Sequence, residues 1–385
     1  MPVSKLGYNH QRTFCVFLCM ILHVSGIQAA PIRQGRAVPV EHPRLLGSRE
    51  YLKSLSASRP DAYKRVVDVA RRQKADDHAK MISMALVCAI ENDEQLGKEA
   101  VQLAMKYVAG TIKIGHVPFA HDLALCAIVY DLCHEFWTKE QRVQFHEYVN
   151  ATVDANVLSE THVFHNGWYG YKNWGIGLAC YATYYENDRA PAILDELEAD
   201  WRTRAAPALE LAGDGGGWAE GYYINYWLYE WLFFCEVARR CEGIDHYAEA
   251  PKFFENRAVA GMFETYPGIS TYNSRRPIPM GDGGGRVFGG DRDKALSARR
   301  ILVSRFADPT HQAVHAFNEQ TPRSSVGDYA YKDFLWRDTP FDSAHPSTPL
   351  RVKPSCRAKT RHERRRGVKA GNLADFKLSH ISTGP

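Results

Sequence analysis

The chain has 385 residues, of which 45% are hydrophobic and 24% are charged, and this composition excludes a chain that is disordered throughout. The formal net charge is +4, but the basic residues concentrate in the segment 351–369, and the rest of the chain is slightly acidic. Since the body carries no basic stripe interleaved with aromatic residues, we expect no nucleic-acid partner.

The N-terminus has the features of a signal peptide. Basic residues precede an apolar run at 13–24, and the small residues Ala29 and Ala30 follow it. The run is shorter than the roughly 20 residues that span a bilayer, so a cleaved signal over 1–30 is favoured over a membrane anchor. The sequence therefore predicts a secreted or periplasmic protein without a stable membrane anchor.

Seven cysteines remain beyond the predicted signal peptide, and most lie singly among apolar residues at helical spacing. Such cysteines behave as small hydrophobic residues, so no disulfide framework is expected, although a bridge involving Cys235 or Cys241 stays open. No CxxC or HExxH motif is present, and we therefore predict no cofactor and no metal-binding residues. A divalent metal ion is left open.

Helical signals follow one another from Ser48 to Pro309, and sheet signals are scarce. Asn92 with Gln95, and Thr138 with Gln141, match the capping box that begins a helix. Apolar residues at helical spacing are Met81, Met84, Ala85 and Cys88, and then Leu123, Cys126, Ala127, Tyr130 and Cys133. The expected helices are 60–73, 76–91, 93–111, 118–135, 138–156, 171–186, 190–211, 220–241, 249–266 and 293–306.

Paired antiparallel helices in this number can stack as a solenoid or close into a ring, so the fold class is all-α over residues 31–345. Glycine-rich sequences at 213–217 and 281–285 lie between helices and are expected to be turns that permit positive φ. Beyond about residue 340 the helical pattern ends. The basic segment 346–385 is predicted to be a disordered tail.

Three clusters of residues are suited to chemistry. In the first, at 162–182, His165, Asn166, Trp168, Asn173 and Trp174 lie close together in the sequence. Asn173 and Trp174 are expected to begin an apolar helix, whose N-terminal end favours an anion. The alternative is that both tryptophans fill the core and His165 is an ordinary loop histidine.

The second cluster, at 213–231, presents Trp218 and Glu220 after a glycine turn. A helix is expected to follow, with Tyr222, Tyr226 and Tyr229 on one face and Tyr223 about a quarter turn away. The alternative here is an aromatic core helix.

The third cluster, at 271–294, contains Arg275 and Arg276. Two guanidinium groups could hold a carboxylate or sulfate through paired hydrogen bonds. The alternative is that these arginines are solvated.

Five segments carry a resemblance to a known family. They are HPRLLGSREYL near the expected mature N-terminus, IVYDLCHEFWTKEQR at 128–142, KNWGIGLACYA at 172–182, DGGGWAEGYY at 214–223 and PIPMGDGGG at 277–285. In this order and spacing they resemble the heparinase II/III-like polysaccharide lyases and their alginate-lyase relatives, over most of 42–310. The resemblance implies an incomplete α/α toroid, which in that family is normally followed by a β-sandwich domain.

The resemblance also implies a reaction, β-elimination at a uronic acid of an acidic polysaccharide. Asn173 would neutralise the sugar carboxylate with help from His165 or Asn166, and Tyr223 or Tyr226 would move the protons. Residues expected to bind substrate are Trp168, Trp174, Trp218, Glu220, Arg275 and Arg276.

Two other functions stay open at this point. An inverting glycoside hydrolase on an α/α barrel would use Asp214 with Glu220 or Glu230. A non-catalytic glycan-binding remnant is the other alternative, because the family draws a further histidine from the β-sandwich, and a short basic tail takes the place of that domain here.

Overall fold

The computed structural model describes residues 36–115, 117–156, 168–264, 291–306, 308–311, 313–314 and 328–336. All of them belong to one compact unit, residues 1–341. Predictions that lie outside the described residues concern the signal peptide, the basic tail, the turn at 281–285, His165, Asn166, Arg275, Arg276, and the side chains of Trp168 and Tyr222.

The described residues form helices and no strand, so the all-α prediction is confirmed, and the finer prediction of an incomplete toroid stays a prediction. In chain order the first helices are α2 (Arg49–Ser58), α3 (Pro60–Ala70), α4 (Asp77–Glu91), α5 (Glu94–Val108), α6 (Pro118–Leu132), η1 (His134–Phe136) and α7 (Lys139–Ala155). Next are α8 (Trp168–Lys172), η3 (Asn173–Gly177), α9 (Leu178–Ala182), α10 (Ala190–Asp200), η4 (Trp201–Ala205), α11 (Ala206–Ala212) and η5 (Gly221–Tyr226). The last are α12 (Leu228–Glu242), α13 (His246–Glu249), α14 (Pro251–Phe263), α15 (Asp291–Arg305) and α17 (Ala330–Trp336).

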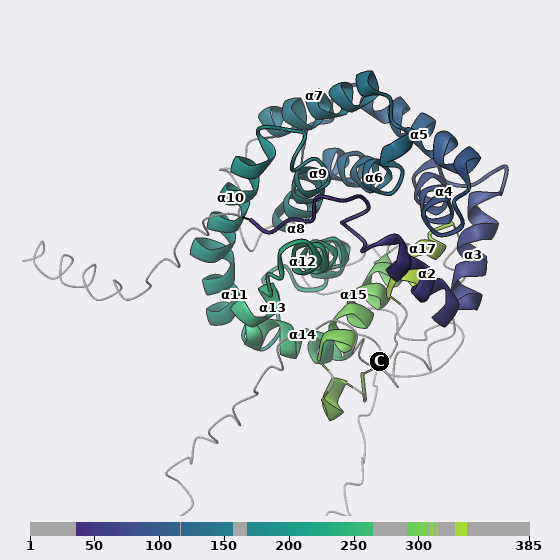
Figure 1. The fold of residues 1–385 in the computed structure, drawn as a ribbon. Coiled ribbons are helices and arrows are strands. Elements are labelled where there is room, and N and C mark those ends of the chain that lie inside the picture. The colour runs from purple at the N-terminus through teal and green to yellow at the C-terminus, as the bar shows by residue number, and fades with distance from the viewer. Residues whose placement is uncertain are drawn as a thin grey trace, which may run out of the picture. The chain divides into compact units, whose positions relative to one another are not determined.

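The helices lie in two layers (Figure 1). Helices α3, α5, α7, α10, α11 and α14 lie on the outside, and α4, α6, α9, α12, α15 and α17 lie inside them. Contacts run from α4 to α6, α9, α12, α15 and α17 in turn, and α17 contacts α3 and α4. The inner helices therefore form a closed cycle of contacts.

The last described helix completes this cycle through specific bonds to the first helices. The guanidinium of Arg59, between α2 and α3, donates to the carbonyl oxygens of Phe334 and Leu335 at 2.7 and 2.9 Å. Asp333 forms ion pairs with Arg65 on α3 and with Arg300 on α15.

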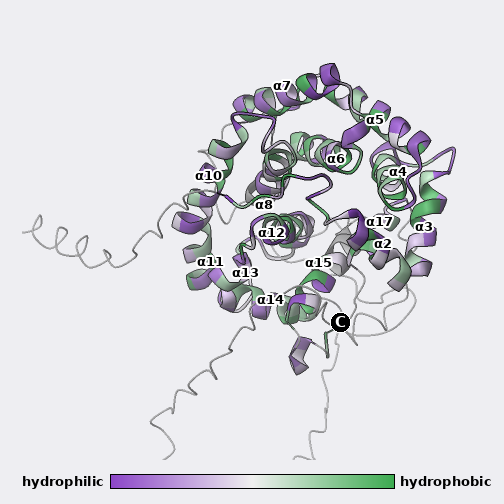
Figure 2. Cartoon of the chain, in the orientation of Figure 1, coloured by the Kyte–Doolittle hydropathy of each residue, from purple (hydrophilic) through white to green (hydrophobic). Residues whose placement is uncertain are grey.

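Hydropathy explains the two layers. Every residue of α6 from Phe119 to Leu132 except His121 is buried, and most of them are apolar, which is typical of an inner helix that is covered on all sides. In the outer helix α7 the buried residues form a single stripe at helical spacing: Phe145, Tyr148, Val149, Thr152 and Val153. Figure 2 shows the same contrast, with mixed colours on α7 and hydrophobic colours prevailing on α6.

One capping prediction is confirmed and the other is wrong. Thr138 and Gln141 form the expected reciprocal capping box at the start of α7. Asn92 instead ends α4 with φ of 59°, and the neighbouring Asp93 begins α5 by accepting a hydrogen bond from the Leu96 amide. Asparagine tolerates the left-handed conformation, so this short connection uses it to end one helix rather than to begin the next.

The helix expected from residue 220 is divided. A 3₁₀ helix, η5, ends at Tyr226, and Trp227 takes φ of −133° before α12 begins at Leu228. The predicted common face of Tyr222, Tyr226 and Tyr229 is therefore wrong, because Tyr229 belongs to a different helix. In a 3₁₀ helix, residues three apart eclipse each other, so Tyr226 pairs with Tyr223 instead.

The six cysteines in the described part of the chain are all free and buried, so the bridge left open for Cys235 or Cys241 is not formed. None of the described helices is long and apolar enough to cross a bilayer.

Candidate active site

Glycines shape the segment that carries Asn173. A Cβ atom on Gly170 would lie 2.3 Å from the ring of Trp227, and one on Gly175 would lie 2.8 Å from the Cα of Ala120 on α6. Gly177 approaches α12 equally closely. The segment runs between α6 and α12, and these three positions have no room for a side chain. This explains why each of them is a glycine.

Asn173 lies inside a helical segment rather than at its start. Helix α8 leads directly into the π-helical turn η3, in which Asn173 and Trp174 are the first two residues. The expectation that these residues begin a helix and face an anion at its N-terminus is wrong, since Lys172 before them is already helical. π-Helical turns often occur at functional sites, but the turn η4 between α10 and α11 is of the same kind.

A hydrogen bond joins this segment to η5. The Tyr171 hydroxyl donates to the carbonyl oxygen of Tyr226 at 2.8 Å, and the two rings meet edge to face with centroids 5.9 Å apart. Tyr223 stacks on Tyr226 at 5.4 Å, and both rings are partly buried. Two of the sequence clusters are therefore neighbours in the fold, through residues 55 positions apart in the chain.

Trp218 and Glu220 form a second contact with this region. The Trp218 indole donates to Glu220 Oε2 at 3.3 Å and packs edge to face on Trp227, with centroids 4.7 Å apart. The other oxygen of Glu220 is buried and accepts no hydrogen bond from the described residues. We call the rings of Tyr171, Trp174, Trp218, Tyr223, Tyr226 and Trp227 the aromatic cluster.

Burial bears on the two described tryptophans that were expected to bind substrate. Trp174 is 2% exposed and Trp218 is 8% exposed, and both pack against other core residues. A ring buried to this extent offers little area for stacking on a sugar. In this structure both rings therefore act as core residues, which the alternative interpretation expected for Trp174.

A buried arginine fixes the glycine turn before η5. Gly216 has φ of 75°, and Arg257 donates to its carbonyl oxygen at 2.7 Å. Arg257 also forms an ion pair with Glu264. Glu264 accepts a 3.4 Å hydrogen bond from Asn225, which lies between Tyr223 and Tyr226 in the sequence. The turn at 213–217 thus has the positive φ that the sequence predicts, and it is tied to η5 through side chains.

His121 on α6 was not identified from the sequence. Its ring lies 5.2 Å from that of Trp174, edge to face, and 5.5 Å from that of Tyr171. It is the one incompletely buried residue between Phe119 and Leu132. A histidine near the start of a mostly apolar helix was the available signal, and it adds a titratable group to the aromatic cluster.

Lys172 is a cation within this segment, but its charge is already paired. The ammonium lies 3.4 Å from Asp200 Oδ2 at the end of α10 and is 2% exposed. Burial lowers the pKa of Lys172, and the neighbouring Asp200 carboxylate opposes that effect. We therefore assign Lys172 a structural role.

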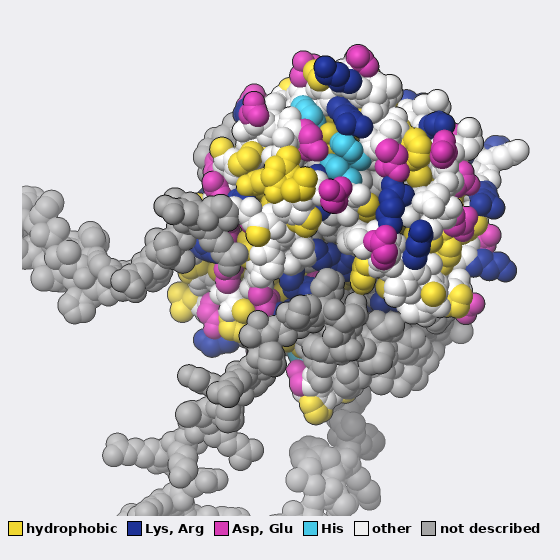
Figure 3. All heavy atoms as spheres, viewed as in Figure 1, with side chains coloured by type: hydrophobic (Ala, Val, Ile, Leu, Met, Phe, Trp, Pro, Cys, Tyr) yellow, Lys and Arg dark blue, Asp and Glu magenta, His cyan; other side chains and the backbone are white. Residues whose placement is uncertain are grey.

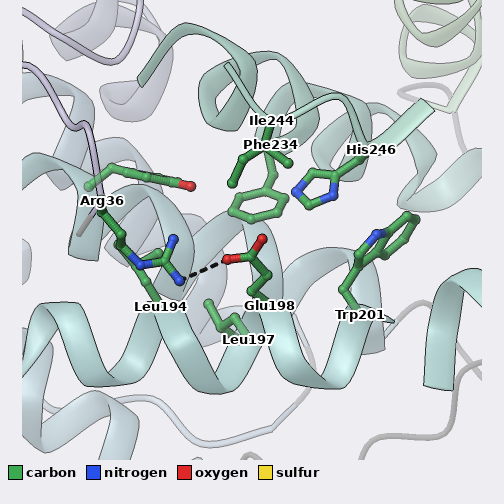
Figure 4. A pocket seen from close by; sticks show the side chains of 9 residues that line it. Arg36, Leu194, Leu197, Glu198, Trp201, Phe234, Ile244 and His246 are labelled. Carbon is green, nitrogen blue, oxygen red and sulfur yellow. Dashed lines mark hydrogen bonds and ion pairs between the residues drawn. The ribbon is translucent and has the colours of Figure 1, made fainter. Parts of the chain in front are cut away.

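One pocket lies elsewhere, between α9, α10, α12 and the chain near Arg36 (Figure 4). Its lining residues are Arg36, Tyr181, Leu194, Leu197, Glu198, Trp201, Phe234, Ile244 and His246. The Arg36 guanidinium pairs with Glu242, Asp195 and Glu198 at 2.6 to 3.0 Å. No residue of the aromatic cluster lines this pocket, and its charged groups satisfy one another.

Comparison with known proteins adds no family assignment, because neither a protein-family model nor a curated protein matches this chain. The resemblance to heparinase II/III-like lyases is carried by the five sequence segments alone.

Proposed function

We propose that the protein is an exported polysaccharide lyase that cleaves uronate-containing glycans by β-elimination. The observation that supports this most is the hydrogen bond from Tyr171 to Tyr226, because it joins the segment of Asn173 to the segment of the two candidate tyrosines. Elimination needs a group that neutralises the uronate carboxylate and a group that moves protons at the same sugar.

In the proposed reaction, the Asn173 amide, which is 1% exposed in this structure, must become accessible to the uronate carboxylate, donate a hydrogen bond to it and so acidify the C5 proton. The phenolate of Tyr223 or Tyr226 removes that proton, the electron pair forms the C4–C5 double bond, and the C4–O bond breaks. The leaving oxygen then takes a proton from the phenol. His121, next to Tyr171 and Trp174, is a further candidate to carry the proton.

Glu220 adds support of a different kind. Its Oε1 atom is buried and accepts no hydrogen bond within the described part of the chain. A buried polar atom without a partner costs about 1–3 kcal/mol, and a hydroxyl-rich ligand could supply the missing donor.

The test is an ultraviolet assay on purified protein with heparan sulfate, alginate and other polyuronides. Elimination yields an unsaturated product that absorbs near about 232 nm. We expect Tyr223→Phe or Tyr226→Phe to lower the rate by about 10²–10⁴-fold. Tyr229→Phe is the matched control, because that phenol is buried on α12 and accepts a 3.0 Å hydrogen bond from Trp336.

Three outcomes would contradict the proposal. Absence of absorbance across the panel would count against a lyase. Reducing ends without absorbance would instead indicate a hydrolase, for which Asp214 with Glu220 or Glu230 are the candidate carboxylates. Retention of glycan without turnover, unchanged in the two tyrosine variants, would indicate a non-catalytic binding protein.

A further inference from the structure

Three residues from distant parts of the chain bring potential metal ligands together. His42 precedes α2, His134 begins η1 after α6, and Glu186 lies in the turn after α9. The His42 Nε2 atom is 3.2 Å from Glu186 Oε1, and the His134 Nε2 atom is 3.8 Å from that same oxygen. One ligand atom from each residue lies within 4.8 Å of the others. We call these three residues the histidine cluster.

The distances suit a small divalent ion. Zinc binds imidazole nitrogen and carboxylate oxygen at about 2.0–2.2 Å, so the ligand atoms of a tetrahedral site lie about 3.4 Å apart. The two separations to Glu186 lie on either side of that value. The imidazole rings stack with centroids 3.9 Å apart and planes 12° apart, so at least one ring must rotate out of the stack before both nitrogen lone pairs point at one ion.

A fixed carboxylate orients His42. Asp131 accepts a 2.7 Å hydrogen bond from His42 Nδ1, which leaves Nε2 directed toward Glu186. Asp131 is held in turn by the backbone amides of Arg44 and Leu45 at 2.8 to 3.0 Å. A carboxylate behind a ligating histidine is the usual support of a zinc site, because it fixes the tautomer and the ring orientation.

His134 provides an independent indication. Its Nε2 atom is buried and forms no hydrogen bond with the residues that the structure describes. A buried nitrogen without a partner is costly, and it faces the Glu186 carboxylate at a distance too long for a hydrogen bond. A bound ion would satisfy this nitrogen.

Arg44 is the group that competes with an ion. Its Nη2 atom lies 2.7 Å from His42 Nε2 and 3.8 Å from Glu186 Oε1. The same atom donates to the Val40 carbonyl oxygen at 2.8 Å, and that bond can persist when an ion takes the histidine nitrogen. Asp131 and Glu186 are opposed by Arg44 and by Arg142, whose guanidinium donates to the His134 carbonyl oxygen at 2.9 Å, so these four charges balance and the case for an ion rests on the ligand geometry.

We propose that His42, His134 and Glu186 bind one divalent ion of the zinc class, with a fourth position open to water. The ion would connect the N-terminal segment, the end of α6 and the turn after α9. Figure 3 shows histidine side chains at the surface between acidic and basic side chains. The side chains of His134 and Glu186 are 19% and 28% exposed, so solvent reaches both residues. The site does not depend on the proposed lyase activity.

The test uses full-length protein treated with a chelator and then titrated with ZnCl₂ in a calorimeter. We expect one ion per chain and a rise in Tm on binding. His134→Gln and Glu186→Gln should each weaken binding at least about tenfold. His246→Gln is the matched control, because His246 is a buried histidine that pairs with Glu249 at 2.9 Å, and its affinity for zinc should equal that of the wild type.

Circular dichroism would confirm that each variant is folded, and Glu186→Gln, at a partly exposed position, keeps the test valid if His134→Gln does not fold. No zinc binding by the folded wild-type protein would overturn the proposal. Equal affinity in Glu186→Gln and the wild type would overturn it as well, and so would an equal loss in His246→Gln.

Discussion

The aromatic cluster and the histidine cluster lie at opposite ends of α6. His121 near the start of this helix contacts the aromatic cluster, and His134 just beyond its end belongs to the histidine cluster. Thirteen residues at about 1.5 Å each separate the two positions by about 20 Å. One helix thus supports an aromatic region at one end and a charged region at the other.

The two regions differ in how the sequence encodes them. The aromatic cluster comes from two dense motifs, so local composition already indicates it. The histidine cluster takes single residues at 42, 134 and 186, and no short motif joins them. A site whose residues come from separate motifs becomes visible only when the helices are placed in space.

The largest expected effect is on activity at the aromatic end. Replacing Asn173 by alanine removes the amide that would neutralise the uronate, so we expect the lyase rate to fall by about 10²–10³-fold. Asn150→Ala is the control, because that amide bonds Asn187 in a different part of the fold and its loss should leave the rate unchanged. An equal rate in Asn173→Ala and the wild type would contradict the proposal that Asn173 neutralises the uronate carboxylate.

The next effect is on stability at the charged end. Asp131→Asn disrupts several hydrogen bonds to one buried carboxylate, and we expect a loss of about 3 kcal/mol in the free energy of unfolding, measured in urea. The exposed pair of Asp154 and Arg189 is the comparison, since Asp154→Asn should cost less than about 1 kcal/mol. Similar losses in both variants would contradict the anchoring role of Asp131.

A smaller loss of folding stability is expected at Gly170, where the backbone lies against the Trp227 ring. Gly170→Ala places a methyl group against Trp227, so the side chain or the backbone must shift, at a cost of about 1–3 kcal/mol. Gly215→Ala has no atom within 4 Å of the added carbon and should be neutral or slightly stabilising. Thermal unfolding of both variants distinguishes a packing constraint from a general effect of removing glycine.

The smallest expected effect is on the pH dependence of stability, through Asp122, a second carboxylate on α6. Burial opposes its ionisation, but the hydrogen bonds from His78 and Lys113 prevail and lower its pKa below the ordinary value. Its stabilising contribution is therefore present above about pH 4 and is lost as the pH falls through the lower folded pKa. We expect the Tm difference between the wild type and Asp122→Asn to shrink below pH 4, whereas a constant difference would contradict this.

Periodicity predicted most of the helices because burial follows it closely. The spacing of Met81 and Cys88, and of Leu123 and Tyr130, marks residues that are indeed buried in α4 and α6. Periodicity could not show that α6 is buried on all sides, because that depends on the helices around it.

Local turn chemistry was harder to predict. Asn92 and Asp93 are both good capping residues, and the sequence does not decide which one ends a helix and which begins the next. The break at Trp227 has no glycine or proline to mark it, and it separated tyrosines that had been placed on one face. The prediction that Asn173 begins a helix was wrong for a related reason. Helix α8 continues into η3 with no capping residue between them, so the sequence does not mark the junction.

The bonds from Arg59 to Phe334 and Leu335 join residues 275 and 276 positions apart in the chain. Whether the chain emerges from a ribosome or from an export channel, the first helices therefore appear long before the partner that seals them. Contacts of such long range slow folding and leave apolar surface exposed in the meantime. We expect release of the finished chain, rather than formation of individual helices, to limit the appearance of native protein, and a chaperone to be most useful during that interval.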